Sequence, residues 1–294
     1  MDTADLKLFE TVARHGSMSR AAAELNTVQS AVTARIRRLE TELDTPLLHR
    51  HSRGVRLTDA GQRLLPFARR LVTLMTEARQ GIVDGGVPGG LLTVGSLETT
   101  AALRLTPLLA GFVAAFPLVD LVLRTGTSAE LIEQVAAGQL EGAFVCGPVS
   151  HGDLLVQTMF REELMLATGW TIRRVEQLRE LRELKIVVLR LGCSYRQRLE
   201  EILARRGIVG LRRLEFGTIE AILGTVAAGI GVTLLPRSVL ERGRRERPLA
   251  LHALPPAEAQ VETLFVRRRD GYLSGALAAL LAHIRSESRR QAAE

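Results

Sequence analysis

The sequence predicts two domains of different class: a small, mainly α domain over about residues 1–58 and a larger α/β domain from about residue 91. A chain of 294 residues is too long for one ordinary core and suits one small domain plus one larger one. Apolar residues repeat at helical spacing up to about residue 83, whereas short apolar strands alternate with helices after residue 91. The glycine-rich segment 84–90 separates the two patterns and predicts a flexible hinge.

The positive charge of the chain is concentrated near its N-terminus. The formal net charge is +7, and residues 26–70 hold nine arginines against four acidic residues. Residues 91–294 hold 26 basic and 22 acidic residues, a net of only +4 over a much longer stretch. A basic surface confined to one domain favours nucleic acid as the partner of that domain.

Several classes of protein are disfavoured by the sequence. No run approaches the roughly 18 apolar residues that a membrane span needs, and the N-terminus carries acids where a signal peptide carries basic residues. We therefore expect a cytoplasmic protein with no membrane partner, in which Cys146 and Cys193 are free thiols. The sequence contains no nucleophile elbow, phosphate-binding loop or metal-ligand spacing. It predicts no enzyme, no cofactor and no metal site.

The third predicted helix has one face for a core and another for a partner. It follows a short alanine-rich helix and a polar turn at residues 26–28, and its apolar residues fall in one narrow stripe. Small polar side chains and arginines occupy its other faces, and these residue types suit the reading of a DNA major groove. A solvated helix face is the alternative, but the alanine-rich helix and tight turn before it favour DNA. The candidate DNA-binding residues on this helix are Gln29, Ser30, Thr33, Arg35, Arg37 and Arg38.

Residues 47–57 predict two short strands around a basic turn, which together form a wing. The wing would bring Arg50, Arg53 and Arg56 close to DNA phosphates. A metal site at His49 and His51 is the minor alternative, because neighbouring histidines in an arginine-rich turn more often contact phosphate or water.

These motifs, in this order, resemble the signature of the LysR family of bacterial transcription regulators. The resemblance rests on GSMSRAAAEL at 16–25, VQSAVT at 28–33, IRRLE at 36–40, LLHR at 47–50 and LTDAG at 57–61. One departure is Ala34, where relatives commonly carry a basic residue that contacts DNA; Arg37 or Arg35 would take over that role. The resemblance implies a winged helix-turn-helix, an interrupted palindrome in double-stranded DNA, often near a divergently transcribed gene, and contact with RNA polymerase.

A long helix is predicted to run to about residue 83, so that residues 59–90 form a linker helix and hinge. Pro66 predicts a kink in this helix. The first turns would pack against the chain's own N-terminal domain, whereas the later turns favour a second copy of the chain. The chain is therefore predicted to form a dimer, as the family resemblance also implies, or a tetramer built as a dimer of dimers. The coiled-coil pattern, with spacings of four and three, comprises Leu57, Gly61, Leu64, Ala68, Leu71, Met75, Ala78 and Ile82.

The region from residue 91 alternates strands with helices, which predicts parallel sheets with helices on both faces. The family resemblance implies the fold of periplasmic solute-binding proteins: two α/β lobes joined by two crossing strands, with a ligand in the cleft. Lobe I would comprise residues 91–161 and 266–294, and lobe II residues 162–265. The predicted strands are 91–94, 118–124, 142–146, 164–167, 186–189, 232–235 and 264–267, and the predicted helices are 102–116, 129–137, 197–206, 219–228 and 274–285.

A ligand of such sheets lies beyond the carboxyl ends of the strands, at the N-termini of helices. Hydroxyls and free backbone N–H groups there suit an anion such as a carboxylate, whereas Glu98 opposes an anion or selects an amine as well. Each Ser or Thr also suits an ordinary helix cap, and a redox switch between the two cysteines, expected on different lobes, is a minor alternative. The candidate effector-binding residues are Ser96, Glu98, Thr99, Thr100, Thr127, Ser128, Cys146, Gly147, Cys193, Ser194 and Thr218.

Together these features predict a DNA-binding transcription regulator whose DNA binding or activation is modulated by a small-molecule effector. One alternative is a cytoplasmic small-molecule receptor, for which the N-terminal domain has no use. The other is an architectural DNA-binding protein, which leaves about two hundred ordered residues without a role.

Overall fold

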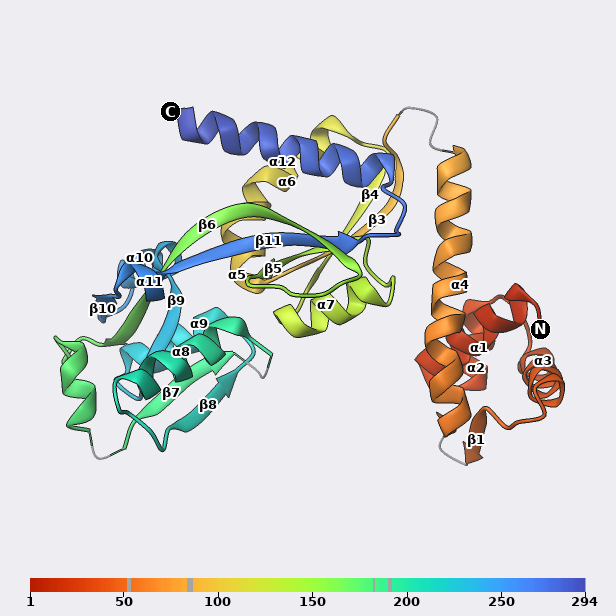
Figure 1. The fold of residues 1–294 in the computed structure, drawn as a ribbon, viewed down its shortest axis with the longest axis horizontal. Coiled ribbons are helices and arrows are strands. Elements are labelled where there is room, and N and C mark those ends of the chain that lie inside the picture. The colour runs from red at the N-terminus through yellow and green to blue at the C-terminus, as the bar shows by residue number, and fades with distance from the viewer. Residues whose placement is uncertain (52–53, 84–86, 182, 190–191, 294) are drawn as a thin grey trace. The chain divides into compact units, whose positions relative to one another are not determined.

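The structure is a computed structural model that describes residues 1–51, 54–83, 87–181, 183–189 and 192–293. The chain divides into two compact units, one of Met1–Gly86 with Ala137–Gln139 and one of Val87–Ala136 with Leu140–Glu294 (Figure 1). No helix in the described part of the chain is both long enough and apolar enough to cross a membrane.

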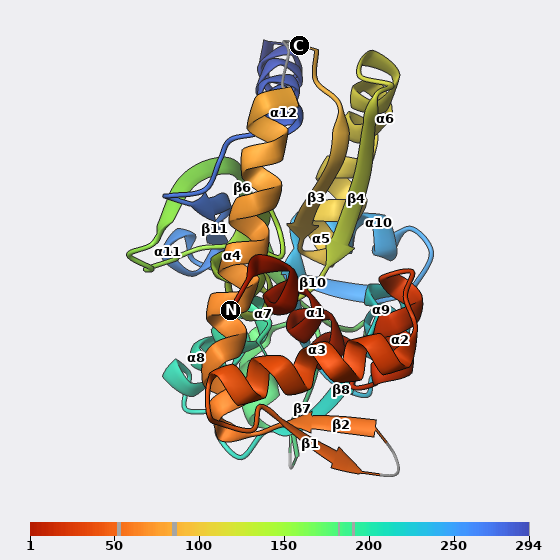
Figure 2. The same ribbon diagram turned by 90° about the vertical axis from the view of Figure 1, so that its right-hand side faces the viewer.

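The N-terminal unit is a cluster of helices with a two-stranded ribbon (Figure 2). β1 and β2 pair antiparallel, with Leu48 opposite Leu57 and His51 opposite Gly54, which confirms the predicted wing. The elements are α1 (Thr3–His15), α2 (Met18–Glu24), α3 (Gln29–Glu42), β1 (Leu48–His51), β2 (Gly54–Leu57) and α4 (Asp59–Val83).

Backbone geometry at two glycines attaches the ribbon to the end of α1. Gly16 ends α1 in the left-handed conformation (φ 59°), and its carbonyl oxygen accepts a hydrogen bond from the Val55 N–H at 3.0 Å. A Cβ on Gly54 (φ 133°) would lie only 2.5 Å from the same oxygen. The predicted wing is therefore fixed to the helix cluster through main-chain contacts that only glycine permits.

The predicted apolar stripe of α3 forms the core of the unit. Val32, Ile36 and Leu39 are fully buried, as is Phe9 of α1. The first turns of α4 cover the same core, since Ala60, Leu64 and Leu65 pack against it and Ala68 is buried. α4 continues as one helix through Pro66.

The C-terminal unit alternates strands and helices as predicted, with several additional elements. The helices are α5 (Glu98–Thr100), the π-helical turn η1 (Ala101–Leu105), α6 (Thr106–Ala115), α7 (Ser128–Ala136), the 3₁₀ helix η2 (Val175–Arg179), α8 (Ser194–Arg205), α9 (Ile219–Ala227), α10 (Arg237–Arg244), α11 (Pro256–Ala259) and α12 (Gly275–Ala293). The strands are β3 (Gly90–Ser96), β4 (Val119–Thr125), β5 (Gly142–Cys146), β6 (Leu154–Gly169), β7 (Lys185–Leu189), β8 (Arg212–Phe216), β9 (Thr233–Pro236), β10 (Leu249–Ala253) and β11 (Gln260–Arg268).

The expectation of parallel sheets holds for only part of the unit. β3 pairs in parallel with β4 and β5, and β7 pairs in parallel with β8. β6 and β11, however, pair antiparallel along their length, and β9 and β10 pair antiparallel with β6. The difference arose because only the buried end of β6, near residues 164–167, was predicted as a strand, so the length of β6 and its antiparallel partners were missed.

Two lobes are built on the two ends of the long antiparallel pair (Figure 1). We call the part built on β3, β4 and β5 lobe I, and the part built on β7, β8, β9 and β10 lobe II. The core of lobe I includes the fully buried Phe112 and Phe144, against which α12 packs through Leu277 and Leu280. β6 and β11 run through both lobes, in agreement with the two crossing strands that the family resemblance implies.

Candidate functional site

In the N-terminal unit, the faces of α3 away from the core carry the predicted DNA-binding residues. Ser30, Ala34, Arg37 and Thr41 are exposed on the side opposite the buried stripe. Figure 2 shows α3 along one face of the unit, above the β1–β2 ribbon. The small Ala34 lies between Ser30 and Arg37 on this face, so a close approach by a partner is possible there.

Two arginines of α3 are held by a carboxylate from α1. Arg35 Nε donates to Asp5 Oδ1 at 2.7 Å, and Arg38 Nη2 donates to Asp5 Oδ2 at 2.6 Å. The Asp5 side chain is buried, which alone would raise its pKa, but the hydrogen bonds from Arg38 and Arg35 outweigh burial and lower the pKa of Asp5. This pair of bonds fixes α3 against α1.

Of the two described wing arginines, one is held by a carboxylate and the other is not. Arg50 Nη2 donates to Glu40 Oε2 at 2.8 Å, while the other oxygen of Glu40 accepts the backbone N–H groups of Leu47 and Leu48. Arg56, one strand away, is exposed and makes no ion pair with a described residue. The predicted contact Arg53 lies outside the described residues.

The start of α3 is partly engaged within the unit. Ser19 Oγ donates to Gln29 Oε1 at 2.8 Å, which orients the Gln29 amide, and Thr33 Oγ1 donates to the Gln29 carbonyl at 2.9 Å. Arg37 differs from Arg35 and Arg38. Its side chain is exposed and makes no hydrogen bond or ion pair with any residue that the structure describes.

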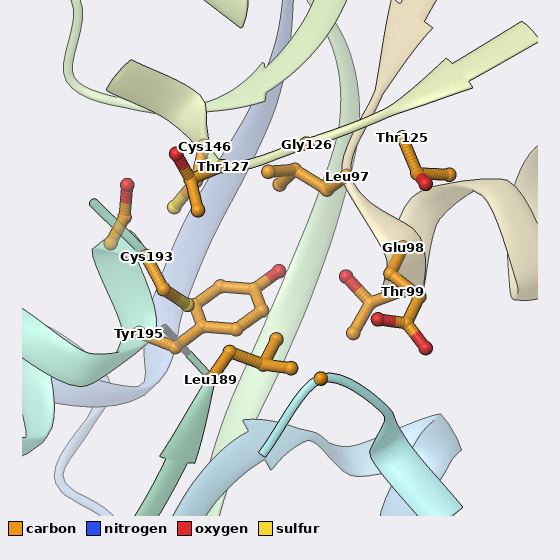
Figure 3. Close-up of a pocket in the computed structure, with 12 residues that line it drawn as sticks. Leu97, Glu98, Thr99, Thr125, Gly126, Thr127, Cys146, Leu189, Cys193 and Tyr195 are labelled. Carbon is orange, nitrogen blue, oxygen red and sulfur yellow. The ribbon is translucent and has the colours of Figure 1, made fainter. Parts of the chain in front are cut away.

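In the C-terminal unit, a pocket lies between the lobes (Figure 3). Its volume is about 40 Å³, room for about three water molecules at 10–15 Å³ each. Lobe I contributes the ends of β3, β4 and β5 and the starts of α5 and α7, and lobe II contributes the end of β7 and the start of α8. The lining residues are Leu97, Glu98, Thr99, Thr125, Gly126, Thr127, Cys146, Leu189, Cys193, Ser194, Tyr195 and Gly217.

Buried hydroxyl groups without partners gather at this pocket. Figure 3 shows the Tyr195 hydroxyl pointing across the pocket toward Thr99. Neither hydroxyl has a hydrogen-bond partner among the described residues, although both side chains are at least 96 % buried, and the adjacent Thr100 hydroxyl also lacks one. Burial raises the pKa of Tyr195 well above its ordinary value, so the phenol stays neutral. Buried polar groups normally have a partner, so these hydroxyls are suited to a polar ligand or to water.

The two lobes also touch directly around the pocket. Ser194 Oγ of lobe II donates to Ser128 Oγ of lobe I at 3.0 Å, and the same Ser128 oxygen accepts the Cys146 N–H at 3.1 Å. Glu98 of lobe I accepts the backbone N–H of Ile219, at the start of α9 in lobe II, at 3.4 Å. These contacts couple the spacing of the lobes to the contents of the pocket.

The two cysteines come from different lobes but line the same pocket. Burial raises the pKa of the Cys146 thiol to about 12, and burial also raises the pKa of Cys193. Both are free thiols and are protonated at neutral pH. A protonated thiol is a poor nucleophile, so the pair acts here as small, weakly polar lining.

The structure brings together six of the eleven predicted effector-binding residues. Glu98, Thr99, Thr127, Cys146, Cys193 and Ser194 line the pocket. Ser128 lies beside it through its bond to Ser194, and Thr100 is buried behind Thr99.

Three of the predicted residues have local structural roles instead. Ser96 is fully buried and donates to the Leu97 carbonyl, and Gly147 donates its N–H to the Glu262 carbonyl. Thr218 caps α9 and lines a different cavity of the same unit. The sequence reasoning missed Leu97, Thr125, Gly126, Leu189, Tyr195 and Gly217. Their position at strand ends and helix starts was the available signal, but the selection favoured Ser, Thr, Cys and Glu and passed over Thr125 and the apolar and aromatic residues.

Two family models match the chain. Residues 3–62 match the bacterial regulatory helix-turn-helix protein, lysR family, and residues 85–289 match the LysR substrate binding domain. The HTH-type transcriptional regulator GltR of Bacillus subtilis (strain 168) is 40% identical over 280 residues, which cover 95% of each chain. The HTH-type transcriptional regulator CzcR of Bacillus anthracis is 37% identical over 284 residues, which cover 97% of each chain.

Solved structures of the same fold agree with this assignment. A full-length OxyR variant from Pseudomonas aeruginosa superposes with a TM-score of 0.74 at 19% identity, over 97% of this chain and 95% of that one. Full-length CbnR complexed with its target DNA superposes with a TM-score of 0.64 at 24% identity, over 97% of this chain and 99% of that one. The chain therefore belongs to the LysR family of DNA-binding transcription regulators, with an N-terminal helix-turn-helix and a C-terminal effector-binding domain.

Proposed function

We propose that this regulator reads DNA sequence with the exposed face of α3 and binds phosphates with the β1–β2 wing. The observation that carries the proposal is Arg37, a cation on the face opposite the core with no partner among the described residues. An arginine held by no carboxylate can donate both of its terminal N–H pairs to a guanine edge. Ser30, Gln29 and Thr33 supply further polar contacts around it.

The remaining arginines contribute mainly to the position of the protein on the duplex. Arg56 and Arg53 of the wing bind phosphates, and Arg50 does so with the N–H groups that Glu40 leaves free. Arg35 and Arg38 fix α3 on α1 through Asp5 and keep further N–H groups for phosphate.

The effector is a small polar molecule that binds between the lobes, against Thr99, Thr127, Ser194 and Tyr195. The unpartnered hydroxyls of Thr99 and Tyr195 support this placement. The starts of α7 and α8 favour a carboxylate on the ligand, while Glu98 favours a donor or a cationic group at the rim. Because the pocket has a volume of only about 40 Å³, a ligand of more than a few atoms requires the lobes to separate.

Ligand binding changes the regulator by shifting an equilibrium between two lobe spacings. A molecule inserted beside Ser194 competes with its direct bond to Ser128, so it favours the spacing in which that bond is broken. That change alters how the assembled regulator spaces or bends its DNA sites, and hence its contact with RNA polymerase. The protein acts in the cytoplasm and catalyses no reaction.

The regulator assembles through α4 as a dimer, or as a dimer of dimers. The early coiled-coil positions cover the unit's own core, whereas Leu71, Leu74, Met75 and Ile82 are exposed apolar residues on the later turns, with Ile82 86% exposed. A second copy of α4 would cover them. A dimer places two copies of α3 on one duplex, which matches an interrupted palindrome.

Selection of genomic fragments by the purified full-length protein, with sequencing of the bound pool at several salt concentrations, tests the proposal. We expect enrichment of an interrupted palindrome whose affinity falls steeply as salt rises. Equal recovery of all fragments would contradict sequence reading by α3. Binding that did not change with salt would contradict the role of the arginines.

A further inference from the structure

A second cavity lies between the lobes, next to the first pocket at Glu98. Its volume is about 340 Å³, against about 40 Å³ for the first. Lobe I supplies Glu98, Ala102 and Leu103, and lobe II supplies the start of α9 and one side of α10. Glu98 is the one residue that lines both cavities. The second cavity is within the size range of small-molecule sites, whereas the first is not.

Five charged residues line the second cavity, two arginines and three glutamates, and ion pairs hold three of them. Arg247 pairs with Glu220 at 2.6 Å and with Glu246 at 3.7 Å. Arg242 lines the cavity and makes no ion pair with any described residue. Glu98 has no ion pair in the described chain either, and its one hydrogen bond is the long 3.4 Å contact from the Ile219 N–H. The cavity thus offers one cation and one anion to a ligand.

The rest of the wall is apolar. Leu103, Ile219, Leu223 and Val239 line it, and Leu223 and Val239 are almost fully buried. A ligand that fills this space gains from burial of an aliphatic group, but it must also supply a partner for each free charge. A simple carboxylic acid would leave Glu98 unpaired, and a simple amine would leave Arg242 unpaired.

We propose that this cavity is a second small-molecule site and that it binds an α-amino acid with an aliphatic side chain. The carboxylate of the ligand pairs with Arg242, its ammonium group pairs with Glu98, and its side chain lies against Leu223 and Val239. Guanidinium–carboxylate pairs are strong and directional, so Arg242 contributes most of the selectivity. The site is distinct from the effector pocket, but it shares Glu98 with that pocket.

Calorimetric titration of L-leucine into the full-length protein tests the proposal. We expect saturable binding of leucine, with 4-methylpentanoate (no ammonium) and 3-methylbutylamine (no carboxylate) each binding about tenfold more weakly or worse. Arg242→Gln and Glu98→Gln should each weaken leucine binding about tenfold or more, as expected from the loss of one charged contact. Arg244→Gln is the matched control, because Arg244 lies on the same helix but does not line the cavity, and it should bind leucine as the wild type does.

Three results would overturn the proposal. The first is absence of leucine binding to the wild-type protein. The second is unchanged leucine affinity in Arg242→Gln, with circular dichroism showing that the variant is folded. The third is loss of leucine binding in Tyr195→Phe while Arg242→Gln still binds, which would assign the ligand to the first pocket and leave the second cavity without one.

Discussion

The arginines proposed to contact DNA in the N-terminal unit are charged and exposed, whereas most side chains that line the effector pocket of the C-terminal unit are neutral and buried. Arg37 and Arg56 face solvent, while arginines that fix the frame pair with Asp5 or Glu40. Around the inter-lobe pocket, Thr99, Tyr195 and Cys146 are buried, and no described lining residue other than Glu98 carries a charge at neutral pH. A polyanion is bound by unpaired surface cations, but a small molecule is bound by groups that water does not reach.

The comparison also shows how each unit keeps its site in place. The α3 face that we propose to read DNA is held by strong local bonds between α1 and α3, so its position does not depend on a ligand. The pocket is held by weak contacts between two lobes, such as the bond between Ser128 and Ser194. A rigid reader and an adjustable sensor are the two properties that a ligand-controlled regulator requires.

The thiols of the C-terminal unit provide the largest expected effect. A pKa of about 12 for Cys146, against the usual 9.0, lowers the thiolate fraction at pH 8 about a thousandfold. We expect Cys146 to react with iodoacetamide about a thousandfold more slowly in the native protein than in urea, as measured by peptide mass spectrometry over time. Equal rates of Cys146 alkylation in the native protein and in urea would show that the pocket is open to water. That result would contradict the claim that the pocket is lined by buried side chains.

The next largest effect is expected where a glycine of the N-terminal unit packs closely against a main-chain carbonyl. A Cβ on Gly61 in α4 would lie 2.2 Å from the Leu47 carbonyl oxygen, whereas a Cβ on Gly224 in α9 meets nothing within 4 Å. We expect Gly61→Ala to destabilise the N-terminal unit by about 3 kcal/mol, and Gly224→Ala, the matched control, to be neutral or to stabilise by about 0.5–1 kcal/mol. Urea unfolding measures both. Similar effects for the two variants would contradict the tight attachment of α4 to the wing.

The Asp5 bonds account for part of the stability of the N-terminal unit. Loss of the carboxylate in Asp5→Asn should cost about 2 kcal/mol at pH 7, because both guanidinium bonds lose their charged acceptor. The pKa of Asp5 is lowered on folding, so this stability is present above about pH 4, the ordinary Asp value, and is lost as the pH falls further. The difference between wild type and variant should therefore shrink in acid.

Asp44→Asn is the control for this comparison. Asp44 is exposed and has a left-handed backbone (φ 47°), which asparagine adopts readily. The free energy of unfolding of Asp44→Asn should match that of the wild type both at pH 7 and in acid. A pH-independent cost in Asp5→Asn would mean that the carboxylate matters only for its shape.

The smallest effect is expected at His252 in the C-terminal unit. Burial lowers the pKa of His252. Its Nε2 atom forms a hydrogen bond with Thr168 Oγ1 at 2.8 Å. A buried neutral histidine contributes stability above its unfolded pKa of about 6.5, and that stability falls as the pH drops below this value. In His252→Gln the free energy of unfolding should fall less between pH 7.5 and pH 5 than it does in the wild type. The control variant His151→Gln, at an exposed site, should follow the wild type. Identical pH slopes for the wild type and His252→Gln would contradict this account.

The N-terminal unit could be predicted almost completely from the sequence because its elements are local. Residues of α3 separated by three or four positions share a face, and the wing strands are only two residues apart in the sequence. Ion pairs between helices could not be predicted. Nothing in the sequence linked Asp5 to Arg35 and Arg38, which lie about thirty positions away. The sequence therefore selected arginines of α3 and the wing as candidates but did not separate the free ones from the paired ones.

The pocket of the C-terminal unit could be predicted only in part. Helix starts identified Thr127 and Ser194, but their proximity depends on two lobes joined by the long strands β6 and β11. Cys146 and Cys193 were expected apart for the same reason. Tyr195 was missed because an aromatic residue inside a helix is typical of a core, and only its unpartnered hydroxyl indicates a binding role.

The comparison of Arg37→Ala with Arg38→Ala tests the central claim most directly. Both residues are exposed on α3, but only Arg38 bonds to Asp5. Affinities are measured for the DNA fragment that the wild type enriches and for a random duplex. We expect Arg37→Ala to weaken binding to the enriched fragment about tenfold to a hundredfold and to change binding to the random duplex much less, with a smaller and sequence-independent effect for Arg38→Ala. Wild-type affinity of Arg37→Ala for the enriched fragment would contradict the claim that the unpaired arginine of α3 reads the DNA.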